Sequence, residues 1–345
     1  MHISEFDYDL PEKLIAQEPL PRRDASRMLV VDRGKKTWVD TNFATAPDYI
    51  RDNDVLVINN TRVFPARLIG QRDPSGGRVE VLLLGERGPS VWEALVKPGA
   101  RLPQGARLKF GDSQLRADVL DAPGNGLRQL RFEYEGPWET ILEKVGETPL
   151  PPYISRLAGV SLADRERYQT IFARHQGAIA APTAGLHFTP QVFDRVLARG
   201  AQVIEITLHV GYGTFEPVRV NDIAQHHVAS EEFELCEKAA SAINDARAGG
   251  GRVIAVGTTT ARALESSVNA RGQLEPARTK TDLTIVPGCK FRVVDALLTN
   301  FHLPRSSLLL LVCAFAGRDF ALQAYRHAVS RGYRFYSYGD CMLLI

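Results

Sequence analysis

The sequence predicts an α/β protein, with a sandwich-type α/β main domain and a small antiparallel β-barrel inserted near its N-terminal quarter. Short alternating apolar runs separated by turn residues fill the middle of the chain, and strand–helix alternation follows from about Pro149. We therefore expect a discontinuous α/β domain of residues 1–61 and 149–345 around a barrel of residues 62–148. The length of 345 residues agrees with two domains of about 100–200 residues each.

The barrel prediction depends on short runs that alternate apolar and polar residues. Gly, Pro, Asn and Asp separate these runs, as is typical of turns between antiparallel strands. The expected barrel strands are residues 78–84, 91–97, 106–110, 115–120 and 127–134. The first 61 residues mix short apolar runs with loops and end in a strand-like segment at 54–62.

The second half predicts alternating helices and strands. Helices are expected at 191–199 and 236–248, which glycines terminate, and a third at the threonines after Gly257. The apolar segment 306–316 precedes a helix expected at 318–331. The expected strands are residues 201–210, 252–257, 283–287, 296–300 and 333–337.

Composition limits the class of protein. The net charge is +2, from 42 basic and 40 acidic residues, so any nucleic-acid contact must come from local patches. Four scattered cysteines without CxxC spacing argue against a disulfide framework or a zinc site and favour a reducing compartment. The N-terminus lacks a signal-peptide apolar region, and the longest apolar run, Leu308–Ala316, is shorter than the roughly 20 residues of a membrane helix. We expect a cytoplasmic monomer without membrane attachment.

Several common motifs are missing. The sequence contains no GxxxxGK(S/T), GxGxxG, GxSxG or HExxH. The sequence therefore gives no support for a P-loop NTPase or for the usual dinucleotide-binding or methyltransferase loop. It also gives no support for the nucleophile elbow of α/β-hydrolases or for the zinc-binding helix of metalloproteases.

Polar side chains instead follow the apolar strands of the second half. His187 lies in the Gly- and Thr-rich segment APTAGLHFT, and His209 precedes a Gly-x-Gly turn. By the two-residue period of a strand, Glu205, Thr207 and His209 share one face. Either histidine alone is more often structural than catalytic, but several such turns in one α/β half indicate a site.

Three further turns belong to this set. VGTTTAR begins a helix after Gly257 with free backbone donors, which suit a carboxylate, phosphate or hydroxyl-rich ligand, although threonine is also an ordinary N-cap. LLTNFHLP places Asn300 and His302 beyond a strand's carboxyl end, where α/β sheets bind ligands. Asp340 ends the aromatic segment RFYSYGD, whose rings are more often core than base-stacking and whose aspartate is more often a turn residue than a base.

Basic residues are concentrated in two windows. Residues 22–36 and residues 97–131 each carry a net charge of +4. A solvated charged surface is the ordinary explanation for most of these side chains, and an RNA-contacting stripe is the alternative.

Several blocks of the sequence occur together in one known family. They run in order from residue 6 to residue 340 and include FDYDLPEKLIAQ, LVINNTRVFPARL, GAIAAPTAGLHFT, TLHVGYGTF, AVGTTTAR, TNFHLP and YRFYSYGD. On these blocks the chain resembles the S-adenosylmethionine:tRNA ribosyltransferase-isomerase family of queuosine biosynthesis over nearly its whole length. The resemblance implies an α/β domain with an inserted barrel, and no metal.

The resemblance also implies a reaction. The family transfers and isomerises the ribosyl part of S-adenosylmethionine onto 7-aminomethyl-7-deazaguanine at the tRNA wobble position. The products are epoxyqueuosine-tRNA, adenine and methionine, so S-adenosylmethionine is a consumed co-substrate. The alternatives are a non-catalytic tRNA-binding protein and a glycosyl-type transferase acting on a small free base.

Candidate residues follow from this chemistry and from the shared blocks. Three proton transfers at neutral pH favour histidine, and arginine binds a carboxylate through two donors. The catalytic candidates are His187, His209 and His302, with Asp340 as an alternative base. The candidates for binding S-adenosylmethionine are Gly257, Thr258, Thr259, Arg262 and Asn300. The candidates for RNA are Arg22, Arg23, Arg27, Arg62, Lys97 and Arg156.

The sequence departs from the family pattern at a few positions. Where the family usually has His-x-Met-His-x-Glu, this chain has Val228 and Ala229 in place of the methionine and the second histidine. Thr284 and Cys289 replace aromatic residues on either side of a Pro-Gly pair. Because the other blocks are intact, we expect these four positions not to be essential.

Overall fold

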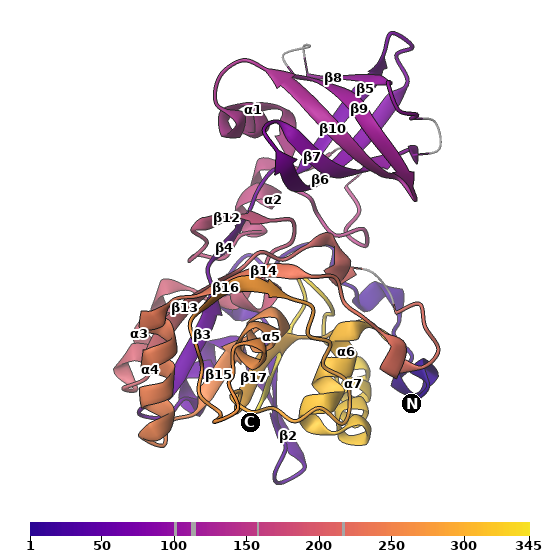
Figure 1. Ribbon diagram of the computed structural model, residues 1–345. Coiled ribbons are helices and arrows are strands. Elements are labelled where there is room, and N and C mark those ends of the chain that lie inside the picture. The colour runs from indigo at the N-terminus through magenta and orange to yellow at the C-terminus, as the bar shows by residue number, and fades with distance from the viewer. Residues whose placement is uncertain (100–101, 112–114, 157–158, 216–217) are drawn as a thin grey trace. The chain divides into compact units, whose positions relative to one another are not determined.

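The computed structural model describes residues 1–99, 102–111, 115–156, 159–215 and 218–345 (Figure 1). The chain forms two compact units, an α/β unit and a barrel unit. The α/β unit comprises Met1–Arg62, Pro151–Ser155 and Arg167–Ile345. The barrel unit comprises Val63–Leu150 and Arg156–Glu166. The predicted fold class, α/β with an antiparallel barrel, is confirmed.

A nine-stranded mixed sheet forms the centre of the α/β unit. Its strands, from edge to edge, are β16 (Ala277–Thr281), β14 (Glu231–Leu235), β13 (Gln202–Leu208), β3 (Val55–Asn59), β15 (Val253–Val256), β17 (Ala296–Asn300), β18 (Cys341–Leu344), β1 (Arg27–Asp32) and β2 (Thr37–Asn42). The four central strands β13, β3, β15 and β17 are parallel, so their carboxyl ends meet at one edge. Strand β18 runs antiparallel to β17 and parallel to β1.

Apolar residues cover both faces of this sheet. Leu56 and Ile58 belong to a core cluster that includes Val192 of helix α3. The alternate residues Val55 and Val57 are fully buried as well, so the opposite face is also covered. Near-continuous apolar strands are typical of a parallel sheet enclosed on both faces.

The helices of the α/β unit follow the strands in chain order. They are α3 (Pro190–Ala198), α4 (Glu237–Ala248), α5 (Thr258–Ser266), α6 (Ser307–Ala316) and α7 (Arg318–Ser330). Helices α6 and α7 pack side by side (Figure 1). Short 3₁₀ helices are η1 (Ile3–Phe6), η2 (Glu12–Leu14), η3 (Arg23–Ala25), η4 (Phe43–Tyr49), η6 (Thr183–His187), η7 (Tyr212–Phe215) and η8 (Ile223–Gln225). Strand β12 (His175–Ala178) pairs with β4 (Thr61–Val63).

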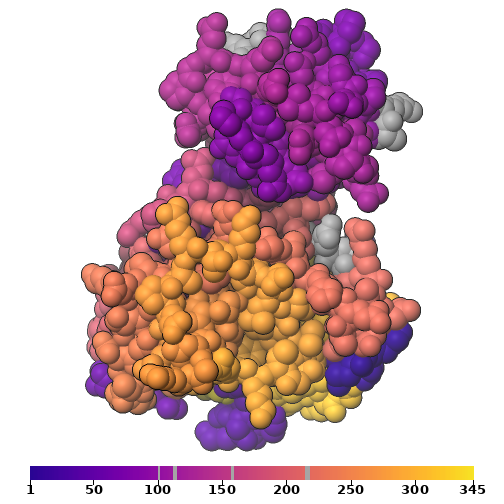
Figure 2. Space-filling model, viewed as in Figure 1, coloured from indigo at the N-terminus to yellow at the C-terminus, as the bar shows by residue number. Residues whose placement is uncertain are grey.

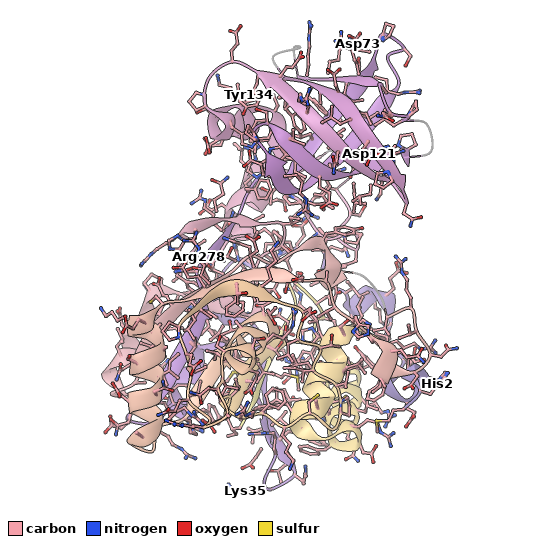
Figure 3. The ribbon with its side chains drawn as sticks, in the orientation of Figure 1. His2, Lys35, Asp73, Asp121, Tyr134 and Arg278 are labelled. Atoms are coloured by element: carbon pink, nitrogen blue, oxygen red, sulfur yellow. The ribbon has the colours of Figure 1, made fainter. Side chains whose placement is uncertain are left out.

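Six antiparallel strands close into the barrel. They are β5 (Arg67–Asp73), β6 (Arg78–Gly88), β7 (Val91–Lys97), β10 (Leu127–Tyr134), β9 (Leu115–Gly124) and β8 (Arg107–Phe110). The barrel closes because β8 also pairs with β5, and the two-residue strand β11 (Gly146–Glu147) extends the sheet beside β5. The remaining helices are α1 (Trp138–Val145) and α2 (Leu162–Arg167). Asp73, Asp121 and Tyr134 mark barrel strands in Figure 3.

Closure of the barrel requires a glycine. A Cβ atom at Gly70 of β5 would lie 2.5 Å from the Lys109 carbonyl oxygen and 2.5 Å from the Phe110 ring of β8. Both distances are shorter than real contacts, so a side chain here would push the two strands apart.

We expect Gly70→Ala to lower the free energy of unfolding by about 1–3 kcal/mol, the usual effect of overpacking. Gly85→Ala is the matched control, because a Cβ at Gly85 of β6 would meet no heavy atom within 4 Å. Urea unfolding of both variants checks this. Equal stability of the two would mean that the β5–β8 contact does not depend on glycine.

Two predicted strands are wrong. Residues 283–287 form no strand, and β16 lies just before them. The Leu283 carbonyl oxygen instead accepts a hydrogen bond from Arg262 Nε (2.9 Å). Residues 333–337 also form no strand, because Tyr333 and Phe335 pack around Phe301 at ring-centroid distances of 5.4 and 5.1 Å. The sheet strand of this region is β18, which follows the aromatic segment.

The β1–β2 hairpin projects from the edge of the sheet (Figures 1 and 2), and Lys35 lies at its tip (Figure 3). In the described part of the chain, no single helix has the length and apolar character to cross a membrane. Helices α6 and α7 reach that length only together, and they are bent by 115° at the break between them.

Candidate active site

A cavity of about 520 Å³ lies at the carboxyl ends of β15 and β17, and we call it the central cavity. Its walls come from the turns after several strands, together with Tyr153. The lining residues are Tyr153, residues 180–184, Val210, Gly257, Thr258, Thr259, Thr299, Asn300, His302, Leu308, Tyr336 and Ser337. Its mixture of apolar walls with few polar groups is typical of a small-molecule site.

The first turn of α5 forms one wall of the central cavity. Gly257 has φ +92°, a conformation that favours glycine, and this sharp turn leads directly from β15 into the helix. Thr258 and Thr259 line the cavity, whereas Thr260 donates its hydroxyl to the Val256 carbonyl (2.7 Å). The first backbone N–H groups of a helix have no partner within it, so this wall can donate to a ligand.

His302 lies in the wall of the same cavity and is buried. Its Nε2 is 2.8 Å from the Thr299 hydroxyl, and its backbone N–H donates to the Tyr325 hydroxyl oxygen (3.3 Å). Burial lowers the pKa of His302 to about 3, because the charged imidazolium would lose its hydration there. The imidazole is therefore neutral at physiological pH.

His187 is connected to the central cavity through Asn300. The Asn300 amide nitrogen donates to the Tyr336 carbonyl (2.9 Å), so its oxygen faces His187 Nε2 at 3.4 Å. The other ring nitrogen, Nδ1, is 2.7 Å from the Ser26 hydroxyl. This arrangement favours the tautomer in which Nε2 carries the proton and Nδ1 accepts from Ser26.

The charge environment keeps His187 neutral. Burial lowers its pKa to about 4, and the positive charges of Arg23 and Arg334 lower the pKa further. The hydrogen bond with Asn300 opposes this shift. His187 thus presents a neutral imidazole with one nitrogen bonded to a hydroxyl.

The other two catalytic candidates have structural partners. His209 follows β13, and its Nδ1 is 2.8 Å from the Thr61 hydroxyl. It is not among the described residues that line the central cavity. Asp340 is buried and accepts hydrogen bonds from the backbone N–H groups of Arg27 (2.9 Å) and Arg334 (2.8 Å), which tie β1 to the segment before β18. Burial raises the pKa of Asp340.

Arg262 of α5 forms a buried ion pair with Glu231 of β14, with Nη1 2.5 Å from Oε2. Its remaining bonds run to the backbone of β16 and of the segment after it, at Thr281 (3.4 Å) and Leu283 (2.9 Å). This guanidinium joins helix to sheet edge and lies outside the described lining of the central cavity.

The six RNA candidates differ in exposure. Arg62 and Lys97 are exposed. Arg22 is also exposed but pairs with Asp24 (3.1 Å). Arg23 is half-buried and donates to the Leu186 carbonyl (3.2 Å), and the Arg27 guanidinium lies 3.7 Å from the centroid of the Tyr333 ring. Arg156 pairs with the buried Asp164 (2.8 Å), so it has an internal partner.

Comparisons with known proteins all indicate the same family, and the matches extend over nearly the full chain. A family model described as queuosine biosynthesis protein matches residues 3–344. The chain belongs to the queuosine biosynthesis protein family. It is 50% identical to an S-adenosylmethionine:tRNA ribosyltransferase-isomerase from Pelotomaculum thermopropionicum, covering 100% of both chains. It is likewise 50% identical to the protein of the same name from Symbiobacterium thermophilum, again over 100% of both.

A solved structure of this queuosine biosynthesis family supports the fold. The crystal structure of S-adenosylmethionine tRNA ribosyltransferase from Thermotoga maritima is 36% identical to this chain, with a TM-score of 0.57. The match covers 99% of this chain and 100% of that one.

Three departures from the family pattern meet in a second cavity of about 460 Å³ in the α/β unit. Val228, Ala229 and Thr284 all line it, and the Val228 N–H donates to the Thr284 hydroxyl (3.1 Å). A Cβ at Gly213 would lie 2.7 Å from the Ala229 Cβ, so even alanine contacts the Gly-x-Gly turn closely. The fourth departure, Cys289, is exposed.

Sequence reasoning missed several residues of the site. Tyr153 lines the central cavity, and its hydroxyl bonds to that of Ser337. Ser26 bonds to His187 although it lies 161 positions earlier in the chain. Tyr153 lies in the segment PLPPYI and Ser26 in RDASRML, and neither segment has a local pattern that indicates these contacts. Among the described residues, no group of three or more His, Cys, Asp or Glu side chains is placed to hold a metal ion.

The buried histidines predict acid sensitivity. The pKa is about 4 for His187 and about 3 for His302 in the fold, against an ordinary value of about 6.5 in the unfolded chain. Between these values the unfolded chain binds protons that the folded protein excludes, so the free energy of unfolding falls as pH falls below about 6.5. Each of these two histidines should lower the free energy of unfolding by about 2 kcal/mol when the pH falls from 6.5 to 5.

Urea unfolding at pH 7 and pH 5 tests this expectation. His302→Gln should remove the part of this loss that His302 contributes. Unchanged or greater stability at pH 5 would show that these imidazoles are charged in the folded protein.

Proposed function

We propose that this chain is a transferase that moves and isomerises the ribosyl part of S-adenosylmethionine onto 7-aminomethyl-7-deazaguanine at the tRNA wobble position. The products are epoxyqueuosine-tRNA, adenine and methionine. The observation that carries the proposal is identity of 50% with S-adenosylmethionine:tRNA ribosyltransferase-isomerases over the whole length of both chains. The central cavity, with its neutral histidine and helix N-terminus, supports it.

The central cavity receives the donor. Its first-turn N–H groups at Thr258 and Thr259 suit the hydroxyls or the carboxylate of S-adenosylmethionine, and Gly257 keeps side-chain atoms away from them. Asn300 and Thr299 add polar contacts at the end of β17. Arg262 does not contact the donor. It positions α5 through its ion pair with Glu231 of β14.

The reaction needs three proton movements. The sulfonium acidifies the adjacent C5′ hydrogens, so one leaves to a base; the departing adenine gains a proton; and the incoming amine loses protons on bonding to the sugar carbon. We assign the proton exchange at the cavity wall to His302, which lines this cavity. Its imidazole is neutral and can accept a proton, and because burial and a bound sulfonium both disfavour the charged form, that proton must pass on to another group.

The tRNA contacts the protein through its basic residues. Arg22, Arg62 and Lys97 are the exposed members of the predicted set and are the most available to phosphates. Arg23, Arg27 and Arg156 also make contacts within the protein. The protein works as a cytoplasmic monomer, and S-adenosylmethionine is consumed rather than regenerated. We expect turnover without any added metal.

Product analysis tests the proposal. Incubation with S-adenosylmethionine and tRNA carrying the modified base should yield adenine and methionine in equal amounts, together with a ribosyl-derived mass gain on the tRNA. A chelator should not change the rate. Accumulation of S-adenosylhomocysteine would contradict the proposal, and tRNA binding without any mass gain would support a non-catalytic tRNA-binding protein instead.

A further inference from the structure

A third, smaller cavity of about 310 Å³ lies beside the central cavity in the α/β unit, and we call it the arginine pocket. Three arginines line it: Arg22, Arg23 and Arg167. No aspartate or glutamate is found among its described lining residues. The hydroxyl-bearing residues Ser26, Ser337 and Tyr338 complete the polar wall.

Arg23 and Arg167 are held in place by backbone carbonyls, and Arg22 is held by the Asp24 carboxylate (3.1 Å). Arg167 donates from Nη1 to the Pro21 carbonyl (3.1 Å) and from Nη2 to the Leu20 carbonyl (2.7 Å). Its Nε is buried and has no hydrogen-bond partner in the described part of the chain. Arg23 donates to the Leu186 carbonyl (3.2 Å), next to His187. Anchored guanidinium groups lose little conformational freedom when they bind an anion.

The arginine pocket and the central cavity share a wall. Ser337 lines both, and His187 of the arginine pocket is bonded to Asn300 of the central cavity. A ligand that spans this wall would place one part among the arginines and another beside His302. A nucleotide, with an anionic phosphate attached to a base, has this combination of parts.

We propose that the arginine pocket binds a backbone phosphate of the RNA next to the nucleotide that reacts in the central cavity. This inference rests on the proposed function and adds to it a specific phosphate site with Arg167 as its new member. Guanidinium groups bind phosphate oxygens through charge-assisted, often bidentate hydrogen bonds. The site would fix the position of the modified base relative to the donor.

Exposure favours RNA over the carboxylate of the donor as the occupant. The Arg22 side chain is 77% exposed although it pairs with Asp24, so the pocket can be reached by a large ligand from solvent. The small donor has a polar wall of its own at α5. The donor carboxylate is therefore the competing occupant that the experiment must separate.

The experiment uses an anticodon stem-loop with the modified base and versions in which one phosphate beside that base is a neutral methylphosphonate. We expect one methylphosphonate to weaken binding to the wild-type protein by about 10- to 100-fold, the effect of one charge-assisted hydrogen-bonded contact. Arg22→Gln and Arg167→Gln should weaken binding of the natural stem-loop by a similar factor. In these variants the methylphosphonate should cause little further loss of affinity.

The slope of the logarithm of the binding constant against the logarithm of the salt concentration should fall by about 0.7 per lost contact. Arg326→Gln, an exposed arginine of α7, is the matched control and should change neither quantity.

The outcomes separate this inference from the proposed function. Wild-type turnover combined with unchanged affinity in both arginine variants, each folded by its melting temperature, would overturn the phosphate site alone. A raised KM for S-adenosylmethionine, with no effect of any methylphosphonate, would assign the pocket to the donor carboxylate and also overturn it. Failure of the wild-type protein to bind or modify the stem-loop would overturn the proposed function and the phosphate site together.

Discussion

His302→Gln is expected to lower kcat by about 10²–10⁴ while the protein stays folded and binds tRNA, which is the usual contribution of a general acid or base. His302 lies in the wall of the central cavity, and a glutamine can keep the bond to the Thr299 hydroxyl that His302 makes at 2.8 Å. The substitution therefore removes proton exchange and preserves the local hydrogen bond. Single-turnover kinetics with modified tRNA and S-adenosylmethionine would measure the effect.

His209→Gln is the comparison that gives this result its meaning. His209 bonds to Thr61 at 2.8 Å and lies outside the described lining of the cavity, so we expect a change of less than about tenfold, or about 1.4 kcal/mol of barrier. From the sequence His209 was the leading candidate, ahead of His187 and His302, because it lies on a polar strand face directly before a Gly-x-Gly turn. A large loss with His209→Gln and full activity with His302→Gln would reverse the assignment.

Local patterns in the sequence were sufficient for the parts of the fold where apolar period and glycine turns agree. Val253–Val256 and Ala296–Asn300 are predicted as strands because their apolar runs end at polar turns, and both turns line the cavity. The prediction was wrong at residues 333–337, where aromatic residues mimic a strand. Packing around Phe301 and a positive φ of +74° at Tyr336 break the extended backbone there, and neither is visible in local sequence.

The site could be predicted from its turns but not from its cross-chain contacts. Glycine and threonine at the start of α5 indicate a ligand-binding wall, because the free N–H groups of a helix N-terminus follow from the local sequence alone. The bonds of Ser26 to His187 and of Glu231 to Arg262 join residues separated by 161 and 31 positions, so only the fold reveals them. Arginine is a good carboxylate ligand by type, and the sequence could not show that Arg262 already has a buried carboxylate partner.

The ion pair of Arg262 and Glu231 connects α5 to β14, the strand next to the edge of the sheet. Both side chains are less than 10% exposed, and Glu231 also accepts the Gly211 backbone N–H (2.8 Å). Removing one partner leaves the other charge buried without compensation, which usually costs far more than the net contribution of the pair. The neighbouring pair of Arg278 on β16 and Glu234 on β14 is 87% and 48% exposed, and Arg278 is labelled in Figure 3.

Arg262→Met and Glu231→Gln are each expected to lower the free energy of unfolding by about 3–5 kcal/mol, measured from the urea midpoint. The double variant should lose less free energy of unfolding than the sum of the two single variants, because no unpaired charge is then left buried. The exposed control, Arg278→Gln with Glu234→Gln, should change stability by less than about 1 kcal/mol, since water already screens that pair. The other role predicted for Arg262, binding the donor carboxylate, gives a different pattern: a stable Arg262→Met protein whose KM for S-adenosylmethionine rises at least about tenfold, equal to about 1.4 kcal/mol of binding. That pattern would contradict the structural role, whereas loss of stability without a change in KM would establish it.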